Sequence, residues 1–347
     1  MATYKAAGVD DRKAELLVSF INERIKKSAF CKNLVGEIGF FGGFIKIPRS
    51  CSDNLLVASC DGVGTKILIA KAFEKFDTIG IDLVAMNCND VSVCGATPLF
   101  FLDYIAVGRL NIEREKKIVE GIIRGCEIAG CILAGGETAQ MPDVYADDDF
   151  DLAGFCVGVV KKSKIIGPSK VRRGDVILGI GSNGLHSNGF SLVRKIFFSD
   201  KGIKRNLFKY WSELGRSLGE ELLRPTYIYS PLLGTLVEKK MIHAAAHITG
   251  GGIPGNLSRI IPGNLCAEVY TGCWSVPKIF QIIQEKGNIK SKEMFNVFNM
   301  GIGLIVIVSE KKKEKVKNIV KKLGFRCFEI GVITDGYGDV KLLNKNN

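Results

Sequence analysis

The residues best suited to phosphate and metal chemistry form one short segment, Asp61-Gly62-Val63-Gly64-Thr65-Lys66. It follows a strand-like run that ends at Cys60, and it combines a carboxylate for a cation, flexible glycines, a hydroxyl and an ammonium group. The spacing differs from that of a Walker A loop, G-x-x-x-x-G-K-S/T, and a short D-G-x-G is also typical of an ordinary glycine turn. The segment therefore predicts a phosphate and magnesium site only if other parts of the chain support it.

A second group of polar residues lies on the helix-like run from Asp82 to Val91. At about 3.6 residues per turn, Asp82 and Asn89 share a face, and Asp90 lies about a fifth of a turn from Asp82. Two carboxylates and an amide on an otherwise apolar helix are costly to bury unless a cation or hydrogen bonds satisfy them. The run predicts either a group of site residues or a solvated polar edge.

A third candidate is Glu137, which directly follows the glycine pair Gly135-Gly136. We expect it at a strand end, where its carboxylate would face magnesium or a nucleophile. A simple turn with an exposed glutamate is the alternative.

Two glycine loops in the second half of the chain each join a histidine to hydroxyl groups. One runs from Gly181 to Gly189 and includes His186, and the other is His247-Ile248-Thr249-Gly250-Gly251-Gly252. Backbone amides in such loops bind sugar phosphates, and a nearby imidazole donates a hydrogen bond or moves a proton. A turn with a solvated histidine is the alternative for each loop.

Strand-like and helix-like runs alternate along the first half of the chain, which predicts an α+β (mixed α/β) fold. The expected strands are 55–59, 99–107 and 153–160, and the expected helices are 81–93 and 112–129.

A polar stretch with glycine and proline breakers, 161–175, separates the two halves. We therefore predict two domains, residues 1–165 and 170–347. The second is expected to contain strands at 176–180 and 302–308, a lysine-faced helix at 311–322, and a final strand pair at 328–343.

Composition and charge favour a cytoplasmic globular protein. The chain has 347 residues, of which 46% are hydrophobic and 24% charged. It has no run of about 18 apolar residues and no basic-then-apolar N-terminal pattern, so we expect no membrane partner. The 11 cysteines include no C-x-x-C pair and are expected to be reduced packing residues.

A zinc site and a nucleic-acid surface are two further alternatives. His243 and His247 are four residues apart, but the chain has only 3 histidines and no H-E-x-x-H motif. The net charge is +12, and the richest basic stretch, Lys311 to Lys322, has an apolar stripe opposite its lysines. That pattern favours a solvated helix packed on a domain, and we expect no nucleic-acid partner.

Taken together, these segments resemble the phosphoribosylformylglycinamidine cyclo-ligase family, also called aminoimidazole ribonucleotide synthetases. The resemblance runs nearly end to end and in family order. The matching segments begin at Tyr4 with Ala7-Gly8-Val9-Asp10 and continue with 61–66, 80–86, 98–104, 135–139, 151–155, 185–189, 247–252 and Phe298-Asn299-Met300-Gly301.

The resemblance implies a two-domain homodimer whose N-terminal domains pair their sheets and whose active site lies between the domains. It implies an ATP-dependent ring closure of formylglycinamidine ribonucleotide to 5-aminoimidazole ribonucleotide in purine biosynthesis, with release of ADP and phosphate. ATP and Mg²⁺ are the implied cofactors.

Site residues follow from the matching motifs and are implied by the resemblance. The implied magnesium ligands are Asp61, Asp90 and Glu137. The implied cofactor-binding residues are Asp61, Gly62, Gly64, Thr65, Lys66, Asp82, Asn89 and Asp103. The implied catalytic residues are Lys66, Glu137, His186 and His247, and the implied substrate-binding residues are Ser187, Asn188, Thr249, Gly250, Gly251 and Gly252. For Lys66, pairing with a carboxylate is the alternative to holding phosphate.

The chain departs from the family pattern at a few positions. Gln140 and Asp143 stand where glutamate and glycine are usual, and Ala6, Cys94 and Thr97 stand where aspartate, glutamine and glutamate are common. We therefore assign no role to Gln140. The nearest rivals are selenophosphate synthetase, hydrogenase-maturation and thiamine-phosphate kinase relatives. The glycine-rich stretch from Gly39 to Phe44 lacks the reactive cysteine expected of a selenophosphate enzyme.

Overall fold

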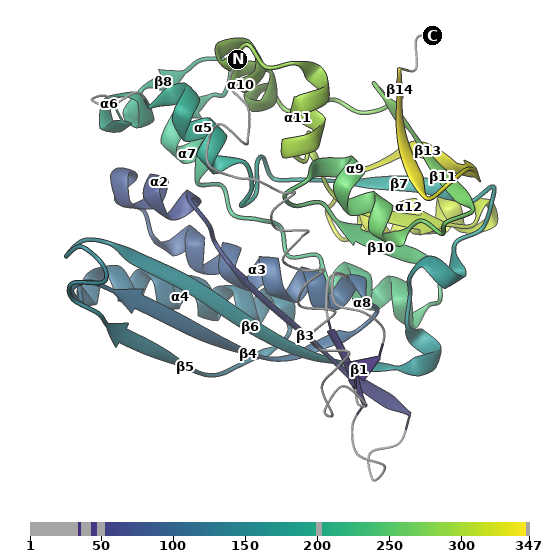
Figure 1. Ribbon diagram of the computed structural model, residues 1–347, viewed down its shortest axis with the longest axis horizontal. Helices are drawn as coiled ribbons and strands as arrows, with labels where there is room; N and C mark the ends of the chain where they lie inside the picture. Colours follow the sequence, from purple (N-terminus) through teal and green to yellow (C-terminus); the bar gives the residue numbers. More distant parts are fainter. Residues whose placement is uncertain (1–33, 36–42, 47–52, 199–202, 345–347) are drawn as a thin grey trace.

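The computed structural model describes residues 34–35, 43–46, 53–198 and 203–344. These residues form two six-stranded mixed sheets with helices packed on them (Figure 1), which confirms the predicted fold class. A separate ribbon pairs β8 (Tyr210–Trp211) with β9 (Arg216–Ser217). The matching segment Ala7-Gly8-Val9-Asp10, the departure at Ala6 and most of the stretch from Gly39 to Phe44 lie outside the described residues.

The first sheet has the strand order β1-β2-β3-β6-β4-β5. All neighbouring strands are antiparallel except β4 and β5, which are parallel. The strands are β1 (Leu34–Val35), β2 (Gly43–Lys46), β3 (Asn54–Gly62), β4 (Thr97–Val107), β5 (Ile132–Gln140) and β6 (Phe150–Lys161).

Two long helices, α3 (Asp77–Val93) and α4 (Ile112–Ala129), cover one face of this sheet and lie between it and the second half of the molecule (Figure 1). They pack against each other through two glycines. A Cβ atom at Gly80 would lie 2.2 Å from the Ile118 carbonyl oxygen, and one at Gly121 would lie 2.2 Å from the Asp77 carbonyl oxygen. The close approach fixes α3, which carries the predicted polar edge.

The second sheet has the strand order β10-β12-β7-β13-β11-β14, with only β11 and β14 parallel. Every residue of β7 and β12 is buried, as expected of strands covered on both faces. The strands are β7 (Val176–Gly181), β10 (Ala244–His247), β11 (Leu265–Thr271), β12 (Ile302–Val308), β13 (Cys327–Asp335) and β14 (Asp339–Asn344).

Shorter helices surround the second sheet and connect the halves. They are α2 (Lys66–Phe73), α5 (Phe190–Phe197), α6 (Ile203–Phe208), α7 (Leu218–Leu222), α8 (Ser230–Glu238), α9 (Gly252–Leu257), α10 (Lys278–Gly287), α11 (Ser291–Val297) and α12 (Lys313–Lys322). Single 3-10 turns are η4 (Lys162–Lys164), η5 (Pro168–Lys170), η6 (Ser258–Ile260) and η7 (Glu310–Lys312). Within the described ranges, no helix is long and apolar enough to cross a lipid bilayer.

The expected strands and helices are present, but two details of the prediction were wrong. The final strands β13 and β14 do not pair with each other, because β11 lies between them. Glu137 does not lie at a strand end, because the segment Gly135 to Ala139 pairs with β4 throughout and forms the middle of β5. Backbone pairing with a long neighbouring strand outweighs the turn tendency of two glycines.

Candidate active site

The polar edge of α3 is buried between the two halves of the molecule. Asp82, Asn87 and Asn89 have no exposed surface, and α3 contacts α8 and β10. The alternative of a solvated edge was therefore wrong. Buried polar groups need hydrogen-bond partners, and these come from connections in the second half of the chain.

Lys66 and Asp82, both in the first half of the chain, form a fully buried ion pair that also contacts the second half. The Lys66 Nζ atom lies 2.7 Å from Asp82 Oδ2 and donates to the carbonyl oxygens of His186 at 3.0 Å and Arg224 at 2.8 Å. Asp82 Oδ1 accepts hydrogen bonds from the backbone nitrogen of Thr226 at 2.7 Å and from its Oγ1 at 2.6 Å. Burial lowers the pKa of the Lys66 ammonium, and the neighbouring Asp82 opposes that shift.

These contacts correct the expectation that Lys66 holds ATP phosphates. The ammonium group donates two of its three hydrogens to the carbonyl oxygens of His186 and Arg224, and its charge is paired with the Asp82 carboxylate. The alternative, pairing with a carboxylate, is what the structure shows, and the partner is Asp82 rather than Asp61. Asp82, also expected to bind cofactor, is buried, pairs with Lys66 through Oδ2 and accepts from Thr226 through Oδ1.

Asn89 and Asp90 hold His247 at the end of β10. Asn89 Nδ2 donates to the Tyr227 carbonyl oxygen at 2.9 Å and lies 3.3 Å from His247 Nε2, while Asn89 Oδ1 accepts from the Tyr229 backbone nitrogen at 2.7 Å. His247 Nδ1 lies 2.8 Å from Asp90 Oδ1. A carboxylate at Nδ1 and an amide donor at Nε2 fit the tautomer that carries its proton on Nδ1. Both ring nitrogens of His247 are thus engaged.

Asp61 and Asp90 form the part of the site that best fits a metal ion. Burial, followed by the negative charge of Asp90, raises the pKa of Asp61 from 3.8 to about 6. Asp61 Oδ1 accepts a hydrogen bond from the Gly62 backbone nitrogen at 2.7 Å. A magnesium ion between the two carboxylates would remove their repulsion, and carboxylate oxygens are ligands that it prefers.

Glu137 does not join these two aspartates, and Asp103 lies apart from them. Glu137 is exposed on β5 opposite Tyr104, with β4 and β6 between it and β3. Asp103 lies in the same row across the sheet as Asp61, two strands away, roughly 10 Å at the usual strand spacing. No three acidic, histidine or cysteine side chains among the described residues are grouped to hold a metal ion. The prediction that Glu137 binds magnesium together with Asp61 and Asp90 of the same chain was therefore wrong.

The loop around His186 reaches the segment 61–66 from the second half of the chain. Thr65 Oγ1 lies 3.1 Å from Ser191 Oγ on α5, and Ser187 Oγ lies 3.1 Å from Thr226 Oγ1. The structure therefore brings together two segments that are far apart in the sequence.

His186 is buried, which overturns the alternative of a solvated histidine. Its Nε2 accepts hydrogen bonds from the backbone nitrogens of Asn183 at 3.1 Å and Tyr227 at 3.5 Å. Burial, followed by the neighbouring His247, lowers the pKa of His186 well below its ordinary value. The imidazole is neutral at pH 7 and carries its proton on Nδ1, which suits hydrogen-bond donation rather than proton transfer.

The glycine loop after His247 is held from within by one asparagine. Asn256 Nδ2 donates to the carbonyl oxygens of Gly250 at 3.0 Å and Gly252 at 2.8 Å. Gly252 has a φ of +59°, and a Cβ atom there would lie 1.9 Å from the Phe295 carbonyl oxygen. Asn188 lies beside this loop, since its Oδ1 would be 3.5 Å from a Cβ atom on Gly250. The two predicted substrate loops are therefore neighbours.

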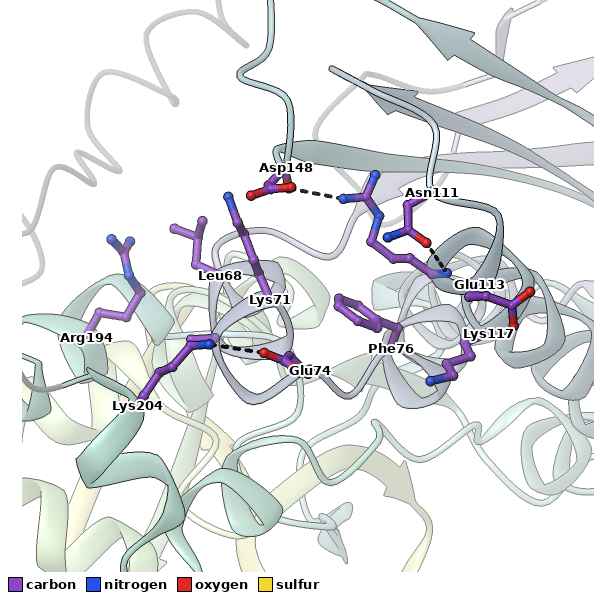
Figure 2. Close-up of a pocket in the computed structure, with 12 residues that line it drawn as sticks. Leu68, Lys71, Glu74, Phe76, Asn111, Glu113, Lys117, Asp148, Arg194 and Lys204 are labelled. Carbon is purple, nitrogen blue, oxygen red and sulfur yellow. Dashed lines mark hydrogen bonds and ion pairs between the residues drawn. The ribbon is translucent and has the colours of Figure 1, made fainter.

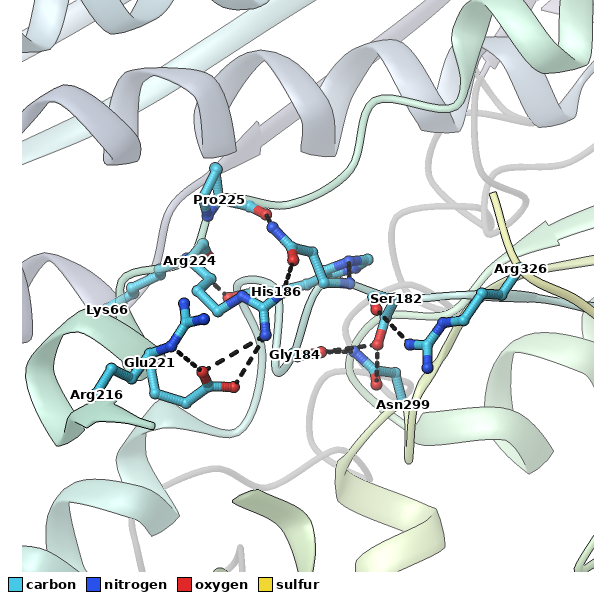
Figure 3. A network of polar contacts seen from close by, with 11 residues as sticks. Lys66, Ser182, Gly184, His186, Arg216, Glu221, Arg224, Pro225, Asn299 and Arg326 are labelled. Atoms are coloured by element: carbon cyan, nitrogen blue, oxygen red, sulfur yellow. Dashed lines mark hydrogen bonds and ion pairs between the residues drawn. The ribbon is translucent and has the colours of Figure 1, made fainter. Parts of the chain in front are cut away.

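The connection from Arg224 to Tyr229 was missed at the sequence level, although it fastens α3 to the second half. Arg224 also hydrogen-bonds the Asn183 side chain and lies 3.3 Å from Glu221, in the network of Figure 3. Asn299, from a matching segment to which we had assigned no role, donates to the Gly184 carbonyl oxygen at 2.9 Å in the same network (Figure 3). The residues of this connection show no motif, so only the folded contacts reveal them.

A hollow of about 720 Å³ lies on another side of α2 (Figure 2). None of the predicted site residues lines it, and its charges are mixed: Lys204 pairs with Glu74 at 3.0 Å.

The alternative of a zinc site bound by His243 and His247 was wrong, because His243 lies 2.7 Å from Asp175 while His247 faces Asp90.

Comparison with known proteins identifies the family of this chain. Residues 44–160 match the family model of the "AIR synthase related protein, N-terminal domain". Residues 172–342 match that of the "AIR synthase related protein, C-terminal domain". The phosphoribosylformylglycinamidine cyclo-ligase of Syntrophus aciditrophicus is 49% identical, with 97% of each chain covered. That of Thermodesulfovibrio yellowstonii is 48% identical over 97% of this chain and 98% of the relative.

Solved structures share the fold at much lower sequence identity. The thiamine-monophosphate kinase of Stenotrophomonas maltophilia has a TM-score of 0.64 at 19% identity, covering 92% of this chain and 94% of that one. A chain of a HypE–HypF complex has a TM-score of 0.65 at 17% identity, covering 95% and 96%. From the near full-length similarity to the curated relatives, the chain belongs to the AIR synthase related family, among the phosphoribosylformylglycinamidine cyclo-ligases.

Proposed function

We propose that this protein closes the ring of formylglycinamidine ribonucleotide to form 5-aminoimidazole ribonucleotide, using ATP and releasing ADP and phosphate. An amide oxygen is a poor leaving group. Once it is phosphorylated, the amidine nitrogen attacks the same carbon and phosphate departs. Catalysis is then mainly positioning and charge neutralisation. Two observations support this proposal most directly. Asp61, Asp90 and His247 lie together between the two halves of the molecule. The chain is also 49% identical to a cyclo-ligase.

For the binding of the ATP phosphates, we propose that Asp61 and Asp90 hold Mg²⁺. When bound, the ion would neutralise phosphate charge. Gly62, Gly64 and Thr65 are proposed to lie along the phosphates of ATP. Among solved structures of this fold, a ThiL was determined with the ATP analogue AMPPCP, which supports nucleotide binding. The buried Lys66 supports the segment from Asp61 to Lys66 from within, through Asp82 and two carbonyl oxygens, and does not contact phosphate.

We propose that the substrate binds to the two adjoining glycine loops. One loop carries Ser187 and Asn188, and the other carries Thr249, Gly250, Gly251 and Gly252. Asn188 Nδ2 and His186 Nδ1 are buried, and neither has a hydrogen-bond partner within the part of the chain that the structure describes. Such donors are costly unless a ligand accepts from them. We propose that they bind acceptor oxygens of the substrate, while His247 and Asn89 position the loops. Asp103 remains a predicted cofactor-binding residue.

We propose a homodimer formed through the face of the first sheet opposite α3 and α4. Apolar side chains are exposed on that face, with Leu102 36%, Phe155 39% and Tyr104 42% exposed, and Glu137 lies among them. Contiguous exposed apolar surface of this kind marks protein interfaces. The dimer would place Glu137 at the interface.

Leu102→Asp is expected to convert the dimer into monomers, because a carboxylate would be buried without a partner at the interface. Light scattering after gel filtration measures the mass. Ile123→Asp is the matched control, since Ile123 is 44% exposed on the outer side of α4. A wild-type monomer, or equal dissociation of both variants, would contradict the interface.

We also propose that the chain divides into two domains, residues 1–165 and 170–347. We further propose that the protein is cytoplasmic and that it has no nucleic-acid partner. The division is supported by the matches over 44–160 and 172–342 and by the two sheets. Cys60, Cys88, Cys126, Cys131, Cys156, Cys266, Cys273 and Cys327 are free thiols, in keeping with a reducing compartment.

The reaction is tested by incubating the protein with formylglycinamidine ribonucleotide, ATP and Mg²⁺. Phosphate release and the aminoimidazole product are expected to appear in equal amounts, and chelation of Mg²⁺ is expected to stop both. Phosphate without aminoimidazole would contradict the ring closure but not the use of ATP. Salt-sensitive binding to DNA or RNA without turnover of ATP would favour the nucleic-acid alternative.

A further inference from the structure

Four cysteines from separate elements gather on the helix-covered side of the first sheet, apart from the proposed active site. Cys88 lies on α3, Cys126 on α4, Cys131 directly before β5 and Cys156 on β6. The sulfur of Cys88 lies 3.8 Å from that of Cys131 and 3.5 Å from that of Cys156. Cys126 and Cys131 also interact through their thiols. We call these four residues the thiol cluster.

Within the thiol cluster, Cys131 differs from the others in exposure and in acidity. It is half-buried, whereas Cys88, Cys126 and Cys156 are buried. Hydrogen bonds from the Cys126 and Cys88 thiols lower the pKa of Cys131. The thiolate is the nucleophilic form of cysteine, so Cys131 is the member that a small oxidant reaches and that reacts with it.

We propose that Cys131 is an oxidation site and that Cys88 resolves it, so that a hydroperoxide creates a disulfide between the start of β5 and α3. The Cys131 thiolate attacks one oxygen of hydrogen peroxide, the O–O bond breaks, and hydroxide leaves with a proton as water. The Cys88 sulfur then attacks the sulfur of the Cys131 sulfenic acid, and the S–O bond breaks with loss of a second water. Two thiols lose two electrons, and one peroxide is reduced to two waters.

The disulfide would act on the proposed active site through α3. Cys88 directly precedes Asn89 and Asp90, which hold His247. The two sulfurs must approach from 3.8 Å to about 2.05 Å. Closing this distance would pull Cys88, and with it the polar edge of α3, toward the start of β5 against the close packing of α3 on α4. Displacements of about 1 Å in a catalytic arrangement cost on the order of 100-fold in rate. This consequence rests on the proposed function, whereas the disulfide itself does not.

The site is tested on the whole protein by peptide mass spectrometry under non-reducing conditions, after hydrogen peroxide treatment and alkylation of the remaining thiols. We expect a peptide pair linked through Cys88 and Cys131 that dithiothreitol separates. It should be absent in Cys131→Ser and retained in Cys156→Ser. Cys327, also half-buried but with its pKa raised to about 12 by burial, should stay alkylatable. A Cys126–Cys131 link, fully alkylatable Cys131, or equal oxidation of Cys327 would overturn the proposal.

The effect on the enzyme is measured as ring closure before and after oxidation. We expect at least about a tenfold loss in the wild type, recovery with dithiothreitol, and no loss in Cys131→Ser. A disulfide without loss of turnover would overturn the coupling to α3. If the reduced protein showed no ring closure, the proposed function would fail while the mass measurement would still decide the oxidation site.

Discussion

Asp61→Asn is expected to lower ring-closing turnover by about 10²- to 10³-fold, the usual effect of removing one group that stabilises developing charge. The asparagine keeps the size of the side chain and an oxygen that accepts from the Gly62 nitrogen, but it removes the charge that would bind Mg²⁺ beside Asp90. Loss of turnover should therefore occur without loss of the fold.

The same substitution is expected to raise the melting temperature of the metal-free protein. Burial and the charge of Asp90 raise the pKa of Asp61 from 3.8 to about 6. A group whose pKa is raised on folding stabilises the fold when protonated, and this contribution is lost as pH rises through about 6. At neutral pH the charged Asp61 therefore costs stability, at most on the order of 3 kcal/mol. Asparagine removes that cost.

Both effects are measured on one preparation, by phosphate release with substrate and by thermal unfolding in a chelating buffer. The gain in melting temperature should be larger at neutral pH than near pH 5, where Asp61 in the wild type is mostly protonated. Asp77→Asn is the control: Asp77 is 52% exposed in the first turn of α3 and pairs with Lys75. Near-normal turnover of Asp61→Asn would remove Asp61 from the proposed metal site.

Lys66→Met is expected to lower the free energy of unfolding by about 3–5 kcal/mol, because it leaves the Asp82 carboxylate buried without its cation. Both side chains are 0% exposed. The substitution also removes two hydrogen bonds to the connection and loop that carry Arg224 and His186. Chemical denaturation measures the loss, and turnover should fall with it because the loops are no longer held against α3.

A double-mutant cycle separates the ion pair from simple loss of packing. Lys66→Met with Asp82→Asn is expected to be less destabilised than the sum of the two single variants, since removing both charges leaves none uncompensated. The exposed pair of Lys75 and Asp77, 3.0 Å apart, is the control, and its removal should cost less than about 1 kcal/mol. Additive single effects at Lys66 and Asp82 would contradict a coupled buried ion pair.

The fold and the family could be predicted from the sequence because their signals are local. Strand-like apolar runs predicted β3, β4 and β6, and helix-like runs predicted α3 and α4. The segment from Asp61 to Lys66 was recognisable because it places flexible glycines beside a carboxylate, a hydroxyl and an ammonium group, and because the other segments of the family pattern accompany it. What the sequence could not supply was the partner of each charged group.

The sequence by itself determined the mixed α/β elements, the family, and which segments carry polar residues suited to chemistry. Only the tertiary structure decided that Lys66 pairs with Asp82 and that Glu137 lies away from Asp61 and Asp90. The physical reason is the same in both cases. Local spacing sets which face of a helix or strand a side chain occupies, whereas its partner depends on how distant segments pack. The lysine of the segment from Asp61 to Lys66 therefore points inward, toward α3 and the connection from Arg224 to Tyr229.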